Sequence, residues 1–165
     1  MGSLDFVDHY LPSTNLRIRE AHVLEMVGYC DHRAGSQSLP PGLPIKAPST
    51  GNFLGILGNR RSQKLVDLIL QQAHSYLSDF PVLGLKVHLG LERYFPVLAR
   101  SDHDPFWKAG VPAVMWTDTS EFRNPHYHKP SDTPDTLDYS FLCMVTQLLV
   151  ACAVGGGSAI TEKAA

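Results

Sequence analysis

The sequence predicts an α/β domain in which helices cover a mixed, largely parallel sheet. Two observations predict this class. Short apolar runs rich in β-branched residues recur along the chain, as expected for buried strands. They are Ala21–Tyr29, Phe53–Leu57, Leu85–Leu89 and Val111–Trp116. Segments with apolar residues at helical spacing separate these runs, which is typical of layered domains built from strands and helices.

Two helices are predicted in the first half of the chain. Met1–Leu11 carries apolar residues at helical spacing, and Pro12 ends it. Ser62 is the expected N-cap of a second helix that runs to about Leu77. Between them, Asp31–Asn52 is rich in Ser, Pro and Gly and is expected to be a loop. Because the loop follows a predicted strand, it either borders a pocket or is a mobile surface excursion.

Two further helices are predicted in the second half. Asp104–Ala109 is a short helix with an aspartate N-cap and Pro105 at its first position. Thr136 or Asp138 caps the last helix, which is expected to run to about Val154 and to end at Gly155–Gly157.

Length and composition limit the classes of protein that fit. The chain has 165 residues, 44% apolar and 18% charged, and predicts one domain over residues 1–154 with a flexible Gly-rich tail over 155–165. A formal net charge of -2 argues against a nucleic-acid partner. No apolar run reaches membrane-spanning length.

The cysteines and the start of the chain bear on the compartment. Cys30, Cys143 and Cys152 form no C-x-x-C pair and predict buried free thiols in a reducing compartment. The printed start shows no signal peptide, which suggests a cytoplasmic protein. If the chain is part of a longer protein, that parent protein could be secreted or periplasmic.

Polar residues gather just past the predicted strand Val111–Trp116. They are Asp118, His126, Tyr127, His128 and Asp132. Ligands of α/β sheets bind outside the carboxyl ends of strands. Prolines on both sides predict extended or turn geometry for the His-Tyr-His segment. In an extended segment the two imidazoles would face one way and Tyr127 the other. An imidazole beside carboxylates suits zinc, but the same spacing fits a polar surface loop.

Glu25 interrupts the apolar strand Ala21–Tyr29. Burying a carboxylate is costly unless it is paired, hydrogen-bonded or bound to a metal. The pattern leaves two interpretations. Glu25 could point outward and pair with Arg17 or Arg19, or it could be a metal ligand.

Three motifs carry a resemblance to a known family. SDHDPFWKAGVPAVMWTD (101–118) is followed by RNPHYHKPSDTPDTLDY (123–139), and VLEMVGY (23–29) lies upstream. In this order the motifs resemble the C-terminal part of the zinc aminopeptidase family, which includes glutaminyl cyclases and glutamate carboxypeptidase-like enzymes. The resemblance implies a three-layer α/β/α sandwich of which this chain would form only the C-terminal part.

The resemblance also assigns roles to single residues. His128 matches the ligand histidine of the family, and Glu25 matches the ligand acid that precedes Met. Tyr127 matches a position that assists the carbonyl oxygen of the substrate. Four more residues would orient ligands or close the site: Asp102, His103, Asp118 and Asp132.

The resemblance implies zinc-dependent hydrolysis of N-terminal peptide bonds, on peptides or small amino-terminal substrates. The family's other ligands and its general base lie upstream of the matched motifs, and Asp5, Asp8 and His9 lack that motif context. This chain alone is therefore expected to be inactive. The alternatives are a catalytically inactive truncated relative that acts as a folded or oligomeric module, self-associating through an exposed sheet edge, and a glutaminyl cyclase-like acyltransferase.

Overall fold

The computed structural model describes residues 2–88 and 90–161, with side chains up to residue 155. Four strands form one sheet: β1 (Ala21–Leu24), β2 (Leu54–Gly58), β3 (Val82–Lys86) and β4 (Ala113–Thr117). Their order is β1-β4-β2-β3. β1 and β4 are parallel, as are β2 and β3, whereas β2 and β4 are antiparallel. The mixed sheet confirms the predicted fold class.

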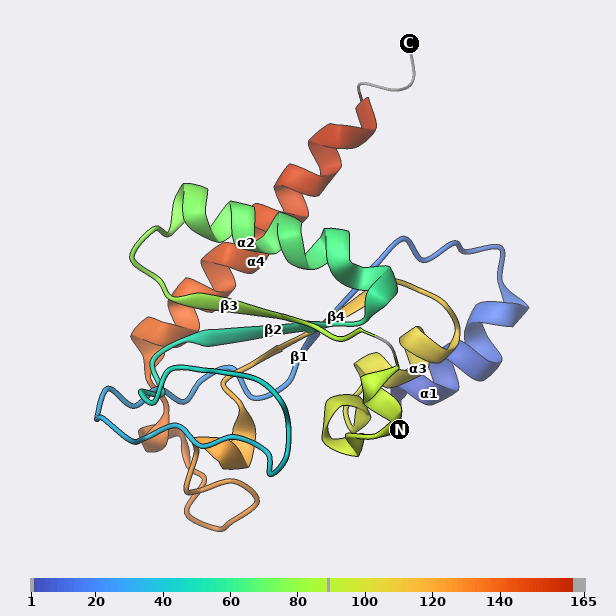
Figure 1. Ribbon diagram of the computed structural model, residues 1–165. Coiled ribbons are helices and arrows are strands. Elements are labelled where there is room, and N and C mark those ends of the chain that lie inside the picture. Colours follow the sequence, from blue (N-terminus) through green and yellow to red (C-terminus); the bar gives the residue numbers. More distant parts are fainter. Residues whose placement is uncertain (1, 89, 162–165) are drawn as a thin grey trace.

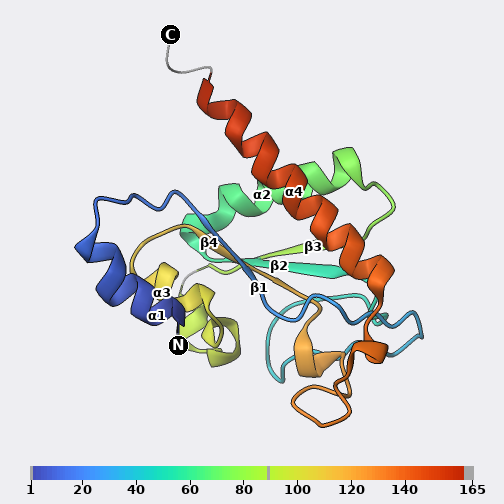
Figure 2. The same ribbon diagram turned by 180° about the vertical axis from the view of Figure 1, so that it is seen from behind.

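Helices cover both faces of this sheet. α2 (Gln63–Tyr76) and α4 (Tyr139–Thr161) pack together on one face. α1 (Gly2–Asp5) and α3 (His103–Lys108) lie on the opposite side, together with the long loop that precedes β2 (Figures 1 and 2). The layers are therefore helix, sheet and helix, as the resemblance implies.

Single helical turns connect these elements. One is a π-helical turn, Phe6–Tyr10, which continues α1. The others are 3-10 turns: Leu11–Ser13, Arg60–Ser62, Leu91–Arg93, Pro96–Ala99, Ser120–Phe122 and Pro134–Thr136.

The alternation of side chains along β4 builds two hydrophobic cores. Val114 and Trp116 point into a cluster formed with α2 and α4. Ala113 and Met115 point to the other face, where they join a second cluster around Trp107 of α3. This period of two is the reason a continuous apolar run can serve both faces of a covered sheet.

Glycines let α2 approach the sheet closely. A Cβ added at Gly58 would lie 2.6 Å from Val66 Cγ2, and one at Gly84 would lie 2.9 Å from Val66 Cγ1. Because both contacts are shorter than 3.0 Å, a larger residue at either position would require Val66 or the helix to shift.

Several predicted boundaries are wrong. β1 ends at Leu24 instead of Tyr29 because Met26 has a φ of 51° and turns the chain. β3 lies earlier than the predicted Leu85–Leu89. α3 begins before Asp104, whose carboxylate pairs with Lys108 at 2.6 Å instead of capping the helix.

The caps of the long helices differ in how well they were predicted. Ser62 stands at the N-cap position of α2, but its hydroxyl donates to Asn59, which caps the preceding turn. Asp138 does cap α4, since its Oδ1 accepts the Phe141 N–H at 2.9 Å. α4 then continues past Val154 to Thr161. The Gly run that was expected to end it costs about 1 kcal/mol per residue in a helix but does not forbid one. Residues 162–165 of the expected tail lie outside the described residues.

Two other expectations can be compared with the structure. All three cysteines are free thiols, as predicted, but the prediction that they are buried holds for Cys152 alone, since Cys30 is half-buried and Cys143 is exposed. Within the described part of the chain, no helix is long and apolar enough to cross a membrane.

Candidate functional site

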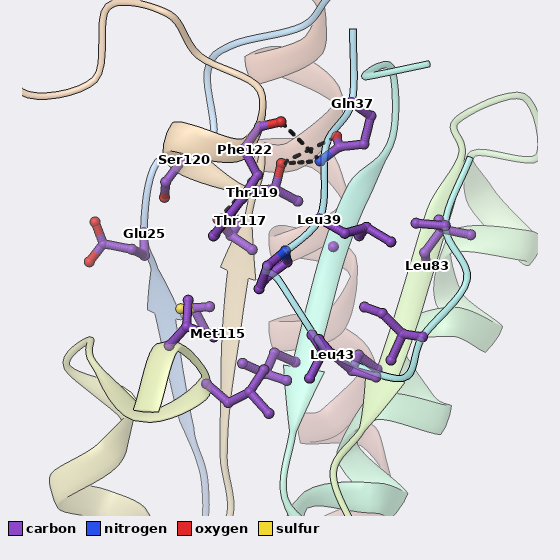
Figure 3. Close-up of a pocket in the computed structure, with 18 of the residues that line it drawn as sticks. Glu25, Gln37, Leu39, Leu43, Leu83, Met115, Thr117, Thr119, Ser120 and Phe122 are labelled. Atoms are coloured by element: carbon purple, nitrogen blue, oxygen red, sulfur yellow. Dashed lines mark hydrogen bonds between the residues drawn. The ribbon is translucent and has the colours of Figure 1, made fainter. Parts of the chain in front are cut away.

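A cleft of about 390 Å³ lies on the sheet face opposite α2 and α4. The sheet supplies one apolar wall, and the loop before β2 lies over it and supplies the other (Figure 3). The sheet wall includes Leu57, Leu83, Leu85 and Met115, and the loop wall includes Leu39, Leu43 and Ile45. Of the two interpretations of this loop, the one in which it borders a pocket is confirmed.

Hydrogen bonds of the Gln37 side chain connect this loop to the turn after β4. Its side-chain amide donates to Thr119 Oγ1 at 2.8 Å and to the Phe122 carbonyl at 3.4 Å (Figure 3). Its Oε1 accepts from Arg123 Nε at 2.9 Å. The guanidinium of Arg123 is buried and lies over the Phe53 ring, 4.5 Å from its centroid. These contacts fix one end of the cleft wall.

Glu25 lies at the polar end of the cleft, directly after β1 (Figure 3). Its N–H donates to the Trp116 carbonyl at 2.9 Å, which continues the pairing of β1 with β4. Its Oε2 accepts from Ser101 Oγ at 2.5 Å. Ser101, rather than Arg17 or Arg19, is therefore the hydrogen-bond partner of this carboxylate.

The His-Tyr-His segment is a turn, which is one of the two geometries predicted from its flanking prolines, and it is not extended. Lys129 N–H donates to the His126 carbonyl at 2.9 Å, and His128 has a φ of 54°. The rings of Tyr127 and His128 stack, with centroids 4.0 Å apart, and both residues line the cleft. His126 is separated from them, since its Nδ1 lies 3.0 Å from Ser131 Oγ.

Glu25, Tyr127 and His128 thus line one cleft. They come from the segments that follow β1 and β4, two parallel neighbours whose carboxyl ends meet at the same edge of the sheet. This is where ligands of α/β sheets bind. Glu25 and His128 therefore lie at the same end of the sheet.

Asp118 is buried and ties these two segments together. Its Oδ2 accepts the Tyr29 N–H at 2.8 Å, and its Oδ1 accepts the Ser120 N–H at 3.0 Å. Burial raises the pKa of this carboxyl to about 6, although the two amides and the charge of Arg123 oppose the shift. Asp118 positions the backbone on both sides of the cleft without lining it.

The raised pKa of Asp118 predicts a specific pH dependence of stability. The native state binds more protons at this group than the unfolded state between its ordinary pKa of 3.8 and about 6. The proton on Asp118 therefore stabilises the native state fully below pH 4, and this stabilisation is lost as the pH rises through 6. The variant Asp118→Asn does not titrate, so its free energy of unfolding should rise relative to the wild type over this range, by on the order of 1–3 kcal/mol.

Denaturant unfolding of both proteins at several pH values measures this difference. Comparing the two proteins cancels the contributions of other titrating groups to the pH dependence. One of these is His103, since burial lowers the pKa of its imidazole. A difference that is flat, or that moves the other way, would mean that the amides and Arg123 outweigh burial.

The remaining sequence-predicted residues have other partners. Asp102 accepts from Ser3 Oγ at 2.6 Å. His103 is buried, with Nε2 2.9 Å from the Leu98 carbonyl and its ring edge-on to Trp107. Asp132 is exposed. None of these three is among the residues that line the cleft.

Sequence reasoning did not identify Ser101 as the partner of Glu25, although the serine begins the SDH motif. It also missed the strained backbone around the cleft. Among the described residues, the non-glycine residues with positive φ are Met26, Thr119, Ser120 and His128, and all lie in segments next to Glu25 or the His-Tyr-His turn. Such strain is typical of functional sites. Non-glycine residues rarely adopt a positive φ, so the sequence does not predict this backbone strain.

The cleft holds too few metal ligands in this chain for a complete zinc site. Glu25 and His128 offer a carboxylate and an imidazole, which are donors that zinc accepts, but zinc takes three or four protein ligands. Within the described residues, the group of three closely spaced donors is Cys30, His32 and Asp138, which does not include either cleft residue. A zinc ion in the cleft would need further ligands.

The fold and the cleft define a class of protein: an α/β/α domain with a carboxylate and an imidazole at the carboxyl ends of two parallel strands. The sequence model described as "Peptidase family M28" matches residues 61–153, more than half of the chain. The chain belongs to peptidase family M28, which supports the zinc aminopeptidase resemblance.

The chain is also similar to a curated protein and, in its fold, to solved structures. The "Uncharacterized protein YfbL" of Escherichia coli K12 is 34% identical over 125 residues, which are 74% of this chain and 36% of that protein. Two solved structures of the Legionella pneumophila LapA aminopeptidase have a TM-score of 0.64 and 20% identity, and they match 93% of this chain. The chain spans 34% to 36% of the length of these relatives.

Proposed function

We propose that this chain forms the substrate-binding part of a zinc-dependent aminopeptidase, an enzyme that hydrolyses N-terminal peptide bonds. The observation that carries the proposal is the placement of Glu25, Tyr127 and His128 on one mostly apolar cleft. Membership in peptidase family M28 supports a peptide substrate. The apolar walls suit an apolar side chain at the peptide N-terminus.

Each residue has a role in this proposal. Glu25 and His128 would supply two ligands of the zinc ion that the family uses, and Ser101 would hold the Glu25 carboxylate in position. The Tyr127 hydroxyl would donate a hydrogen bond to the carbonyl oxygen of the substrate. The general base and the other ligands would come from outside this chain.

Fragment complementation tests the proposal. The chain is co-expressed with the part of the E. coli relative that lies outside the matched region, and the purified assembly is assayed with leucine p-nitroanilide and zinc. We expect chelator-sensitive hydrolysis that falls by at least ~10²-fold in Glu25→Ala and in His128→Ala, as for lost catalytic groups.

His74→Ala is the matched control. His74 lies near the end of α2, is exposed and does not line the cleft, so this variant should retain activity. Hydrolysis that survives both cleft substitutions would contradict the assigned ligands.

A second candidate function is a catalytically inactive module that self-associates. The observation that favours it is the position of β1 at the end of the sheet, paired with β4 alone among the described strands. Nearby apolar side chains are exposed, including Leu24 at 43% and Leu16 at 55%. Unpaired edges and exposed apolar residues promote association.

Light scattering over a range of concentrations tests this module. We expect a concentration-dependent dimer, and Leu24→Lys should shift it toward monomer because a charge on an edge strand opposes pairing. Tyr94→Lys, at a residue that is 77% exposed and away from β1, is the control. A strictly monomeric wild type that unfolds cooperatively would reject self-association.

A further inference from the structure

A second group of metal-ligating side chains lies outside the cleft. Cys30 and His32 follow β1, and Asp138 directly precedes α4. Each of the three side chains offers one donor atom, and these atoms all lie within 4.8 Å of one another. None of the three residues is among those that line the cleft.

The closest pair already has the spacing of ligands on one metal ion. Cys30 Sγ lies 3.4 Å from His32 Nε2. Zinc–sulfur and zinc–nitrogen bonds of about 2.3 and 2.0 Å at a tetrahedral angle place the two donor atoms about 3.5 Å apart. One oxygen of the Asp138 carboxylate lies within 4.8 Å of both other donor atoms, which is near enough for a third ligand.

The backbone holds these residues in place. Asp138 Oδ1 accepts the Phe141 N–H at 2.9 Å, which orients the carboxylate, and its own N–H donates to the Gly28 carbonyl at 2.8 Å. The turn that carries His32 is fixed by a bridge from Asp31 to Gly51. Cys30 packs against the main hydrophobic core. Ligands on a supported backbone lose little freedom when a metal binds.

The donor types select the metal class. A thiolate and an imidazole favour zinc, cobalt or copper over magnesium and calcium, which prefer oxygen. His32 is exposed, so solvent can reach the ion and fill a fourth position. Asp31 and Asp118 add negative charge near Cys30, and the nearby Arg123 opposes it.

We propose that Cys30 Sγ, His32 Nε2 and the Asp138 carboxylate bind one zinc-class divalent ion at the surface, separate from the cleft. The thiol must release its proton when the ion binds. Metal binding should therefore strengthen as the pH rises, because the ion then displaces fewer protons from the thiol. The proposal does not depend on the aminopeptidase function, because it uses none of the cleft residues.

Cobalt titration under reducing conditions tests the site. Co²⁺ bound to a thiolate gives a charge-transfer band in the near ultraviolet, which carboxylate and imidazole ligands do not give. We expect this band to saturate at one equivalent of Co²⁺ per chain. Cys30→Ser should abolish it. His32→Ala and Asp138→Asn should each weaken binding at least ~10-fold, as for groups that support a metal. Asn at position 138 keeps an acceptor for the cap of α4, so this variant should still fold.

Two controls separate this site from the others. Cys143→Ser removes an exposed thiol that has no part in the cluster and should leave the band unchanged. His128→Ala removes a cleft ligand and should also leave it unchanged, so failure of the cleft proposal does not affect this result. Absence of the band in the wild type, or a band that persists in Cys30→Ser while circular dichroism shows a folded chain, would overturn the proposal.

Discussion

The chain on its own should hydrolyse leucine p-nitroanilide at least ~10²–10⁴-fold more slowly than the complemented assembly, even with zinc present. This range is typical of the loss of a general base alone, and the incomplete ligand set of the cleft adds to it. The measurement is the initial rate with and without a chelator, on chain whose fold is verified by circular dichroism.

Chelator-sensitive turnover by the isolated chain would contradict this expectation and would require a base that the sequence does not reveal. The acids to consider are Asp31 and Asp102. Hydrogen bonds from Arg33 lower the pKa of Asp31 to about 2, which makes it a weak base at neutral pH. Asp102 is exposed and outside the cleft lining.

Replacing Trp116 by Ala should have the largest effect on stability. The side chain is 0% exposed and lies in the core between β4 and the helices α2 and α4. Its Nε1 donates to His22 Nδ1 at 3.1 Å, so the substitution removes a hydrogen bond as well as apolar contacts. We expect a loss of about 3–5 kcal/mol in the free energy of unfolding, a large share of the ~5–15 kcal/mol of a typical domain.

Denaturant unfolding measures this loss of stability, and two further variants serve as comparisons. Trp116→Phe should cost less than Trp116→Ala because it keeps most of the buried volume. Tyr94→Ala, at an exposed ring, should change stability by no more than ~0.5 kcal/mol. A Trp116→Ala loss as small as that of Tyr94→Ala would show that the core between the sheet and its helices does not hold the fold together.

The sequence predicts those helices and strands whose apolar pattern reflects packing in the core. The apolar run that became β4 and the helical spacing of α2 both follow from the cores they fill. The boundaries at β1 could not be predicted, because Met26 takes a left-handed backbone that its residue type disfavours. The geometry around Asp118 depends on two backbone amides that no side-chain pattern reveals.

Within the cleft, Glu25, Tyr127 and His128 were found from the motif resemblance, but the orientation of the His-Tyr-His turn was not. Prolines restrict the residue before them, yet the turn bonds from Lys129 and Tyr127 decided the conformation. The cluster of Cys30, His32 and Asp138 escaped notice because its members come from distant segments, and only the packing of α4 against the segment after β1 brings them together.

The loop wall of the cleft has a consequence for selectivity. Gln37 forms hydrogen bonds to the turn after β4, but the hydrogen bonds described for residues 39–47 join residues of the loop to one another. An example is the bond from the Leu43 N–H to the Pro40 carbonyl. Among the described residues this part of the wall has no hydrogen bond to the sheet, and Leu43 packs against the hydrophobic cluster on that face. A surface of that kind distinguishes ligands by one methylene at only ~10–200-fold, whereas a site that forms hydrogen bonds to a ligand reaches far higher ratios. The cleft should therefore accept a range of apolar groups and discriminate only weakly among them.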